Sequence, residues 1–109
     1  MNPILINIVQ GDADYNLNFS LTDAAGAIVN LTGAVVTFNA QSASDAGVQV
    51  TGTMSIVSPT AGTCYYQVQS TDFSIPGTYN AQIVAVYSSV SEKITFTAIT
   101  IVVAARLPV

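Results

Sequence analysis

Short runs of alternating apolar and polar residues recur along the whole chain. In residues 15–21 every second residue is apolar, and residues 34–40 repeat the pattern with Val36 and Phe38 on one face. A period of two is the mark of a strand with one buried face. No segment shows helical periodicity of any length. The pattern therefore predicts an all-β domain.

Turn-forming residues divide the rest of the chain into further short strands. Thr51-Gly52 is expected to separate two of them, and the others are bounded by similar Gly, Pro, Asn, Asp and Ser clusters. About 7–9 short antiparallel strands in 109 residues fit a single Greek-key β-sandwich spanning residues 1–109. These further strands are expected at residues 4–9, 48–50, 53–57, 63–68, 79–87 and 94–104.

The closing strand changes phase part-way along its length. Ile94 and Phe96 alternate in one phase, whereas the apolar residues from Ile99 onward alternate in the other. A β-bulge shifts the phase of a strand by one residue. A bulge near Thr97-Ala98 is therefore expected to turn both sets toward the core.

The stretch around Gly77-x-Tyr79-x-Ala81, with Asp72 upstream, reads as a corner that leads into a long strand. A tyrosine at this place in immunoglobulin-like sandwiches bonds back to the backbone just upstream, two residues before the second disulfide cysteine. Ala81 stands where that cysteine would be. The spacing predicts an immunoglobulin-like sandwich without its disulfide, held by a structural corner of Asp72, Gly77 and Tyr79. The simpler alternative is a tyrosine that only begins a strand.

Charged residues are unusually scarce in this chain. They make up 7% of the sequence, whereas hydrophobic residues make up 50%, and about 25% charged residues is ordinary for soluble domains. The polar surface must consist of Ser, Thr, Asn and Gln, which are more easily desolvated than charged side chains. The composition indicates a chain that packs into an assembly, including a homo-oligomer.

The charge balance also limits the classes of partner. The net charge is −4, and Lys93 and Arg106 are the only cations. Two separated cations do not form the basic face that nucleic acid or an anionic membrane surface requires. The chain has neither an apolar run of about 18 residues nor a secretory signal pattern. The lone Cys64 cannot form an internal disulfide, which fits synthesis in a reducing host cytoplasm.

No residue set in the sequence predicts an enzyme, a cofactor or a small-molecule site. Histidine is absent, so the Ser and Thr hydroxyls lack the commonest general base. Cys64 is expected to be a buried structural thiol. Asp12 and Asp14 have a spacing that suits two calcium ligands, but a complete site needs six or more oxygens and turn aspartates are far commoner. Calcium at this loop stays an open alternative.

A series of turn and alternating-strand motifs extends in a definite order from about Gly11 to Ile101. The series consists of Gly11-Asp12, Leu17-x-Phe19-x-Leu21, Asp23-x-x-Gly26, Asn30-Leu31-Thr32-Gly33, Val36-x-Phe38, Gly62-x-x-x-Tyr66 and Asp72-x-x-x-x-Gly77-x-Tyr79-x-Ala81. In this order it resembles the immunoglobulin-like N-terminal domain of phage baseplate upper proteins and related small phage virion domains. The resemblance implies a structural adaptor that packs against other virion proteins in a symmetric assembly.

The resemblance also implies where the chain is found and which parts make contacts. Family members carry further domains, whereas this chain ends at Val109, so a capsid decoration or accessory virion protein is expected beside a tail-baseplate subunit. Residues 1–9 and 104–109 are the expected assembly-contacting termini. The candidate interface residues are Ile4, Ile6, Ile8, Tyr65, Leu107 and Val109.

A second function class is a carbohydrate- or cell-surface-binding adhesion module. Such sites usually stack sugars on exposed aromatic side chains. In this sequence Tyr65, Tyr87 and Phe73 are the candidates for that role. A glycan screen separates this class from the virion component.

Overall fold

The computed structural model describes residues 4–23, 25–45, 47–69, 71–88 and 92–105. Eight strands and no helix occur in these residues, and so no helix there is long and apolar enough to cross a membrane. The strands are β1 (Ile4–Val9), β2 (Asn16–Ser20), β3 (Ala34–Ser42), β4 (Gln49–Thr53), β5 (Ser55–Ser58), β6 (Thr63–Gln67), β7 (Gly77–Tyr87) and β8 (Glu92–Ala104).

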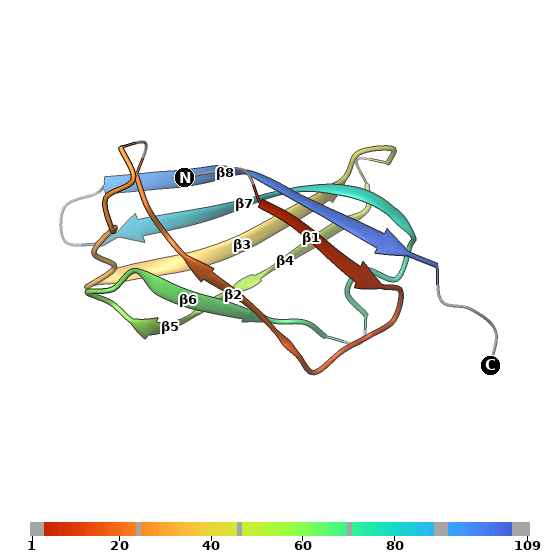
Figure 1. The fold of residues 1–109 in the computed structure, drawn as a ribbon, viewed down its shortest axis with the longest axis horizontal. Coiled ribbons are helices and arrows are strands. Elements are labelled where there is room, and N and C mark those ends of the chain that lie inside the picture. The colour runs from red at the N-terminus through yellow and green to blue at the C-terminus, as the bar shows by residue number, and fades with distance from the viewer. Residues whose placement is uncertain (1–3, 24, 46, 70, 89–91, 106–109) are drawn as a thin grey trace.

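The strands form two sheets that pack face to face (Figure 1). One sheet has five strands in the order β1-β8-β7-β3-β4, and the other has three in the order β2-β6-β5. In immunoglobulin nomenclature β8-β7-β3 corresponds to strands G, F and C, and β2-β6-β5 to strands B, E and D. The expected all-β immunoglobulin-like sandwich is confirmed.

One pairing differs from the expected antiparallel arrangement. β1 runs parallel to β8, with Ile4 opposite Ile99 and Val9 opposite Ala104. The expectation of antiparallel strands is therefore wrong for this pair. Parallel strands need a long connection, and β1 and β8 have one because they come from opposite ends of the chain.

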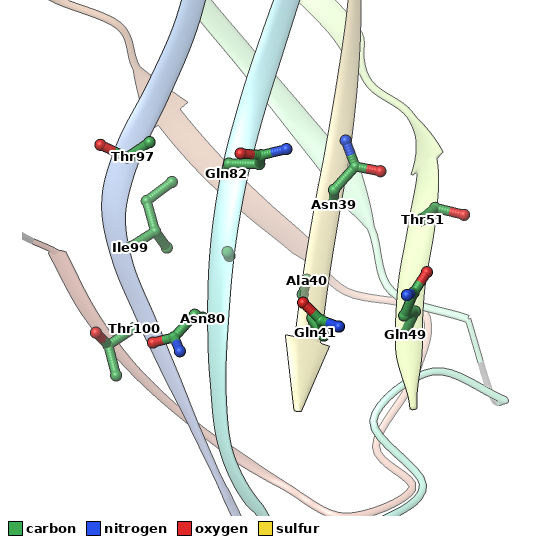
Figure 2. Close-up of a pocket in the computed structure, with 11 residues that line it drawn as sticks. Asn39, Ala40, Gln41, Gln49, Thr51, Asn80, Gln82, Thr97, Ile99 and Thr100 are labelled. Atoms are coloured by element: carbon green, nitrogen blue, oxygen red, sulfur yellow. The ribbon is translucent and has the colours of Figure 1, made fainter. Parts of the chain in front are cut away.

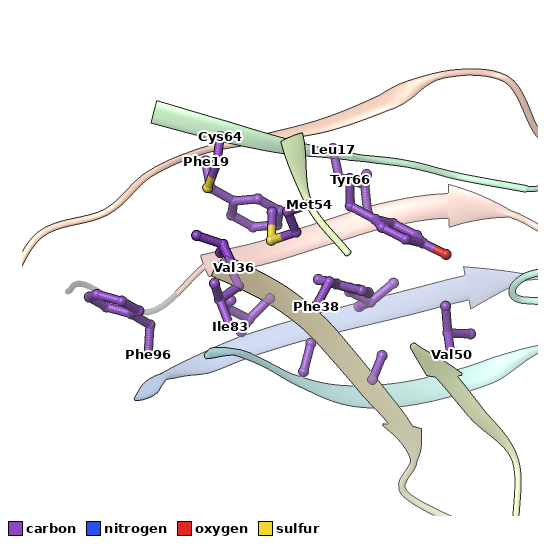
Figure 3. Close-up of a cluster of buried hydrophobic side chains, with 14 of the residues drawn as sticks. Leu17, Phe19, Val36, Phe38, Val50, Met54, Cys64, Tyr66, Ile83 and Phe96 are labelled. Atoms are coloured by element: carbon purple, nitrogen blue, oxygen red, sulfur yellow. The ribbon is translucent and has the colours of Figure 1, made fainter. Parts of the chain in front are cut away.

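The core lies between the sheets and contains the inward-facing residues of both (Figure 3). Phe38 of β3 is stacked on Tyr66 of β6 with ring centroids 4.8 Å apart, and Phe19 of β2 lies 6.2 Å from Phe38. Leu17 and Leu21 are buried in the same alternating pattern as Phe19. The alternation seen in the sequence therefore identified the buried face of these strands correctly.

The predicted bulge in the closing strand is confirmed. Ala81 of β7 pairs with Ile99 of β8, whereas Ile83 pairs with Phe96. Thr97 and Ala98 therefore lie opposite the single residue between Ala81 and Ile83 on β7, which is the definition of a bulge. Phe96 and Ile99 are both buried although they belong to different phases of the sequence pattern.

Gly52 does not form the turn expected at Thr51-Gly52. It lies inside β4 opposite Phe38. A Cβ atom on Gly52 would come within 2.6 Å of Cε1 in the Tyr66 ring. The glycine is needed because an aromatic ring packs against the backbone there, a reason that local turn propensities do not reveal.

Candidate functional site

Two buried tyrosines hold the connection between β6 and β7. The Tyr79 hydroxyl donates a hydrogen bond to the Ile75 carbonyl oxygen at 2.8 Å, and Phe73 packs edge-on against the Tyr79 ring at 5.3 Å. Gly77 precedes the tyrosine with a φ of 136°, a conformation that favours glycine. Burial raises the pKa of Tyr79. The tyrosine therefore joins the start of β7 to the backbone four residues upstream.

Asp72 is hydrogen-bonded to the other buried tyrosine, Tyr66. Its Oδ2 atom accepts hydrogen bonds from the Tyr66 hydroxyl and, at 2.9 Å, from the backbone N–H of Gln69. Burial, and then the hydrogen bond to Asp72, raise the pKa of Tyr66 well above its ordinary value. Asp72 thus fixes the beginning of the connection and Tyr79 fixes its end. Both hydrogen bonds hold the backbone of this connection.

Charged residues are absent from the interiors of the described strands. The described aspartates lie in the connections between strands, and Glu92 and Lys93 are the first two residues of β8. Arg106 lies outside the described residues. The exposed faces of the two sheets are therefore covered by neutral residues over most of their length. The charged residues in connections are Asp12, Asp14, Asp23, Asp45 and Asp72.

The outer face of the five-stranded sheet carries a shallow hollow of about 570 Å³ (Figure 2). Four neighbouring strands contribute its polar side chains, and five of these are carboxamides. The hollow is open to solvent on the side away from the core. Its polar lining residues are Asn39, Gln41, Gln49, Thr51, Asn80, Gln82, Thr97 and Thr100.

Cross-strand pairing arranges these side chains in two rows. In one row Thr51 of β4 is opposite Asn39 of β3, which is opposite Gln82 of β7. The next row places Gln49, Gln41, Asn80 and Thr100 opposite one another across four strands. Residues paired in this way are close enough to interact directly. The rows form a continuous neutral surface of hydrogen-bond donors and acceptors.

This surface consists of neutral groups that can form hydrogen bonds. Each carboxamide offers two donor hydrogens and one acceptor oxygen without carrying charge. No group of three or more His, Cys, Asp and Glu residues that would suit a metal occurs among the described residues. Cys64 is buried at 1% exposure, and burial raises its pKa to about 11. Its thiol is therefore protonated and sheltered at neutral pH.

Comparison with known protein families gives an assignment that agrees with this architecture. The profile of the family described as the BppU N-terminal domain matches residues 1–108. The chain belongs to this family. The resemblance to the N-terminal domain of phage baseplate upper proteins is thereby confirmed. Among curated proteins no sequence matches the chain.

Three of the predicted interface residues in this BppU-type domain face inward. Ile8 is buried, and Ile4 and Ile6 pack partly buried against the core. The choice of these side chains as free contact groups is corrected, because the parallel pairing with β8 turns them toward the sandwich interior. Leu5 and Val9 are the exposed apolar residues of β1, at 65% and 39%.

The remaining predicted contact residues fall into two groups. Tyr65 of β6 is half-buried on the outer face of the three-stranded sheet, opposite Asn18 and Ser55. Leu107 and Val109 lie outside the described residues. The contact role of all three stays a prediction.

The aromatic residues considered for sugar stacking are mostly withdrawn from the surface. Phe73 is only 2% exposed, so its selection as an exposed platform is wrong. Tyr87 is half-buried, and its hydroxyl donates to the Asn30 carbonyl oxygen at 2.6 Å. No aromatic residue lines the hollow on the five-stranded sheet. The described surface offers little for sugar stacking.

The two aspartates considered for calcium lie in the connection between β1 and β2. The Asp12 N–H donates to the Val9 carbonyl oxygen, and the Asp14 N–H donates to the Val68 carbonyl oxygen. Asp14 has a φ of 63°, a turn conformation that aspartate tolerates better than most residues. These contacts account for the aspartates as turn residues.

Sequence reasoning did not single out the carboxamides of the hollow. Their signal is the repeated Asn or Gln at every second position, as in Asn39 and Gln41 of β3 and Asn80 and Gln82 of β7. The pattern shows that these residues face outward. Only the pairing of β3 with β7 and β4 shows that they form one surface.

Proposed function

We propose that this domain is a non-enzymatic structural component of a phage virion that acts through protein–protein contacts. The observation that carries the proposal is the neutral character of both exposed sheet faces, with charge confined to connections and the start of β8. Membership of the BppU N-terminal domain family supports the virion assignment. The partners are other virion proteins and further copies of the chain.

The neutral faces matter because of the cost of desolvation. The centres of protein interfaces are depleted of charged residues, since an ion that leaves water needs a well-placed partner. Asn, Gln and Thr side chains cost less to bury and still provide directional hydrogen bonds. A surface of this kind fits a domain whose sides are covered by neighbouring subunits.

The place within the particle is part of the proposal. A baseplate family supports a position in the tail, and a capsid-decoration role is the alternative. A chain with only two cations supports neither nucleic-acid binding nor attachment to an anionic membrane.

The test is the incorporation of charge variants into phage particles. Gln82→Lys places a charge in the centre of the five-stranded sheet's outer face, whereas Thr60→Lys places the same charge in an exposed connection. We expect Gln82→Lys to reduce incorporation at least tenfold and Thr60→Lys to incorporate like the wild type. Quantitative mass spectrometry of purified particles, and of separated heads and tails, measures the amount and its location.

Thermal unfolding of both purified variants is the control, because an exposed lysine should leave the fold intact. Equal incorporation of both folded variants would contradict a contact role for this face. Absence of the wild-type chain from every particle fraction would contradict the virion assignment. A glycan screen with the same proteins tests the adhesion-module alternative directly.

A further inference from the structure

β4 forms one edge of the five-stranded sheet and lacks the charged residues and the proline that often protect an edge strand. It lies beside β3 with no strand paired on its other side in the described sheet (Figure 1). Its sequence, Gln-Val-Thr-Gly-Thr, contains no charged residue and no proline. Proteins normally guard an exposed edge with lysine, proline, a bulge or a covering loop, because an open edge is a template for another strand.

Two hydrogen bonds show which backbone groups of β4 point outward. The Ser42 N–H donates to the Val48 carbonyl at 2.9 Å, and the Met54 N–H donates to the Val36 carbonyl at 2.8 Å. In an antiparallel pair, alternate residues direct both backbone groups toward the neighbouring strand. The even-numbered residues of β4 therefore bond to β3. The backbone groups of Thr51 and Thr53 point toward the open edge.

These outward groups match those of a second copy of the same strand. An antiparallel pair centred on Thr51 places Thr51 opposite Thr51 of the second copy, and Gln49 opposite Thr53. All three positions direct their backbone groups outward, so these three pairs are hydrogen-bonded pairs, and Val50 and Gly52 of the two copies form the non-hydrogen-bonded pairs between them. The register allows about six backbone hydrogen bonds around a two-fold axis. A register with Val50 or Gly52 on the axis brings only two hydrogen-bonded pairs together within β4, and so allows about four backbone hydrogen bonds.

The side chains of β4 also suit pairing with themselves. Threonine is enriched in strands, and threonine pairs across strands are favourable. β4 contains no charged residue, so pairing with a second copy brings no like charges together. Asp45, the nearest charged residue before β4, lies outside the paired segment. The edge strand β2 is equally neutral, but its exposed residues include Asn16 and Asn18, a residue type depleted in strands.

We propose that two copies of this chain pair antiparallel along β4, with Thr51 on the two-fold axis, to form one continuous sheet. The pairing rests on the proposed function, because it specifies one of the contacts between copies in the virion. It joins the two carboxamide hollows side by side, since Gln49 and Thr51 line the edge of each hollow. A short edge contact of this kind buries little area, so the pair is weak in solution and is reinforced by the particle.

Cysteine cross-linking of the purified full chain tests the pairing and its register. Cα atoms of a hydrogen-bonded antiparallel pair lie about 5.5 Å apart, within the roughly 4.4–6.8 Å that a disulfide spans. We expect Thr51→Cys to form a covalent dimer at least tenfold faster under mild oxidation than Asn18→Cys, the matched variant at the centre of edge strand β2. Cys64 does not interfere because it is buried.

Cross-linking between two further variants tests the register of the pairing. Gln49→Cys and Thr53→Cys should cross-link to each other much faster than either cross-links to itself. Thr51→Lys should shift the chain toward monomer in light scattering across a dilution series, and mixing it with Thr51→Glu should restore the pair. Circular dichroism confirms that each variant is folded.

Equal cross-linking rates for Thr51→Cys and Asn18→Cys would overturn the pairing along β4. Faster self-linking of Gln49→Cys or Thr53→Cys than of their mixture would overturn the proposed register. These results are separable from those for the virion role. Loss of Gln82→Lys from particles without cross-linking at Thr51 refutes only the β4 pairing, and cross-linking without any effect of Gln82→Lys refutes only the contact role of the sheet face.

Discussion

The two faces of the five-stranded sheet share one backbone but have opposite chemistry. Phe38 and Asn39 are neighbours on β3, yet Phe38 is completely buried on Tyr66 while Asn39 lines the open hollow. On β7 the same contrast holds between the buried Ile83 and the exposed Gln82. The inner face stabilises the fold through apolar burial, and we expect the outer face to add little to stability.

The difference between the residues of the two faces indicates what the outer face is suited for. An antiparallel sheet commonly has one buried face and one solvated face, and a solvated face ordinarily carries Lys, Glu and Arg among its residues. Here the outward positions of the strand interiors hold Thr, Asn, Gln, Val and Leu5 instead. The alternation meets the requirements of the fold, and the choice of neutral outward residues meets those of a contact surface.

The largest expected effect separates the two faces on a single strand. Phe38→Ala should lower the free energy of unfolding by about 3–5 kcal/mol, because it removes a fully buried ring and leaves a cavity. Asn39→Ala should change it by no more than about 0.5 kcal/mol. Urea denaturation of both variants measures the difference. Equal losses would show that the outer face also contributes to stability.

The second test concerns the inner face of β4. Gly52→Ala should lower the free energy of unfolding by about 1–3 kcal/mol, because the new methyl group would overlap the Tyr66 ring. That ring is held by Phe38 on one side and by Asp72 at its hydroxyl, so it cannot easily move away. Thr53→Ala, on the outward phase of the same strand, is the control. An unchanged melting temperature for Gly52→Ala would mean that the ring repacks freely.

The smallest expected effect concerns a polar group at the margin of the core. Tyr79→Phe should lower the free energy of unfolding by about 1 kcal/mol, because it removes one hydrogen bond and leaves the Ile75 carbonyl without it. Tyr65→Phe, on the outer face of the other sheet, should have a smaller effect. Thermal unfolding of the two variants checks the order. A Tyr79→Phe variant as stable as the wild type would remove the corner as a source of stability.

Much of the fold followed from local patterns in the sequence. The alternation of residues 15–21 and 34–40 identified the buried faces, since side chains on a strand alternate between its two sides. The phase change after Phe96 indicated the bulge for the same reason. The spacing of Gly77 and Tyr79 indicated a corner, because the turn and its tyrosine are close together in the chain.

The candidate contact surfaces were less accessible to sequence reasoning. The sequence showed that the surface is neutral, but the apolar Ile4, Ile6 and Ile8 of the first strand were expected to face partners. The structure turns them toward the core and leaves Leu5 and Val9 exposed. The polar Asn7 lies in the same phase as Leu5 and Val9 and is the local sign of the outward face. The pairing with β8 sets that phase in the fold.

The sequence by itself determined an all-β sandwich, the buried faces of its clearly alternating strands, its scarcity of charge and its likeness to the BppU N-terminal domain. Each of these properties depends on residue type or on neighbours within a few positions. The tertiary structure alone decided that β1 runs parallel to β8, that Gly52 makes room for the Tyr66 ring, and that polar side chains from four strands form one hollow beside an open edge. Those features depend on contacts between segments far apart in the chain, whose pairing is set by packing of the whole domain.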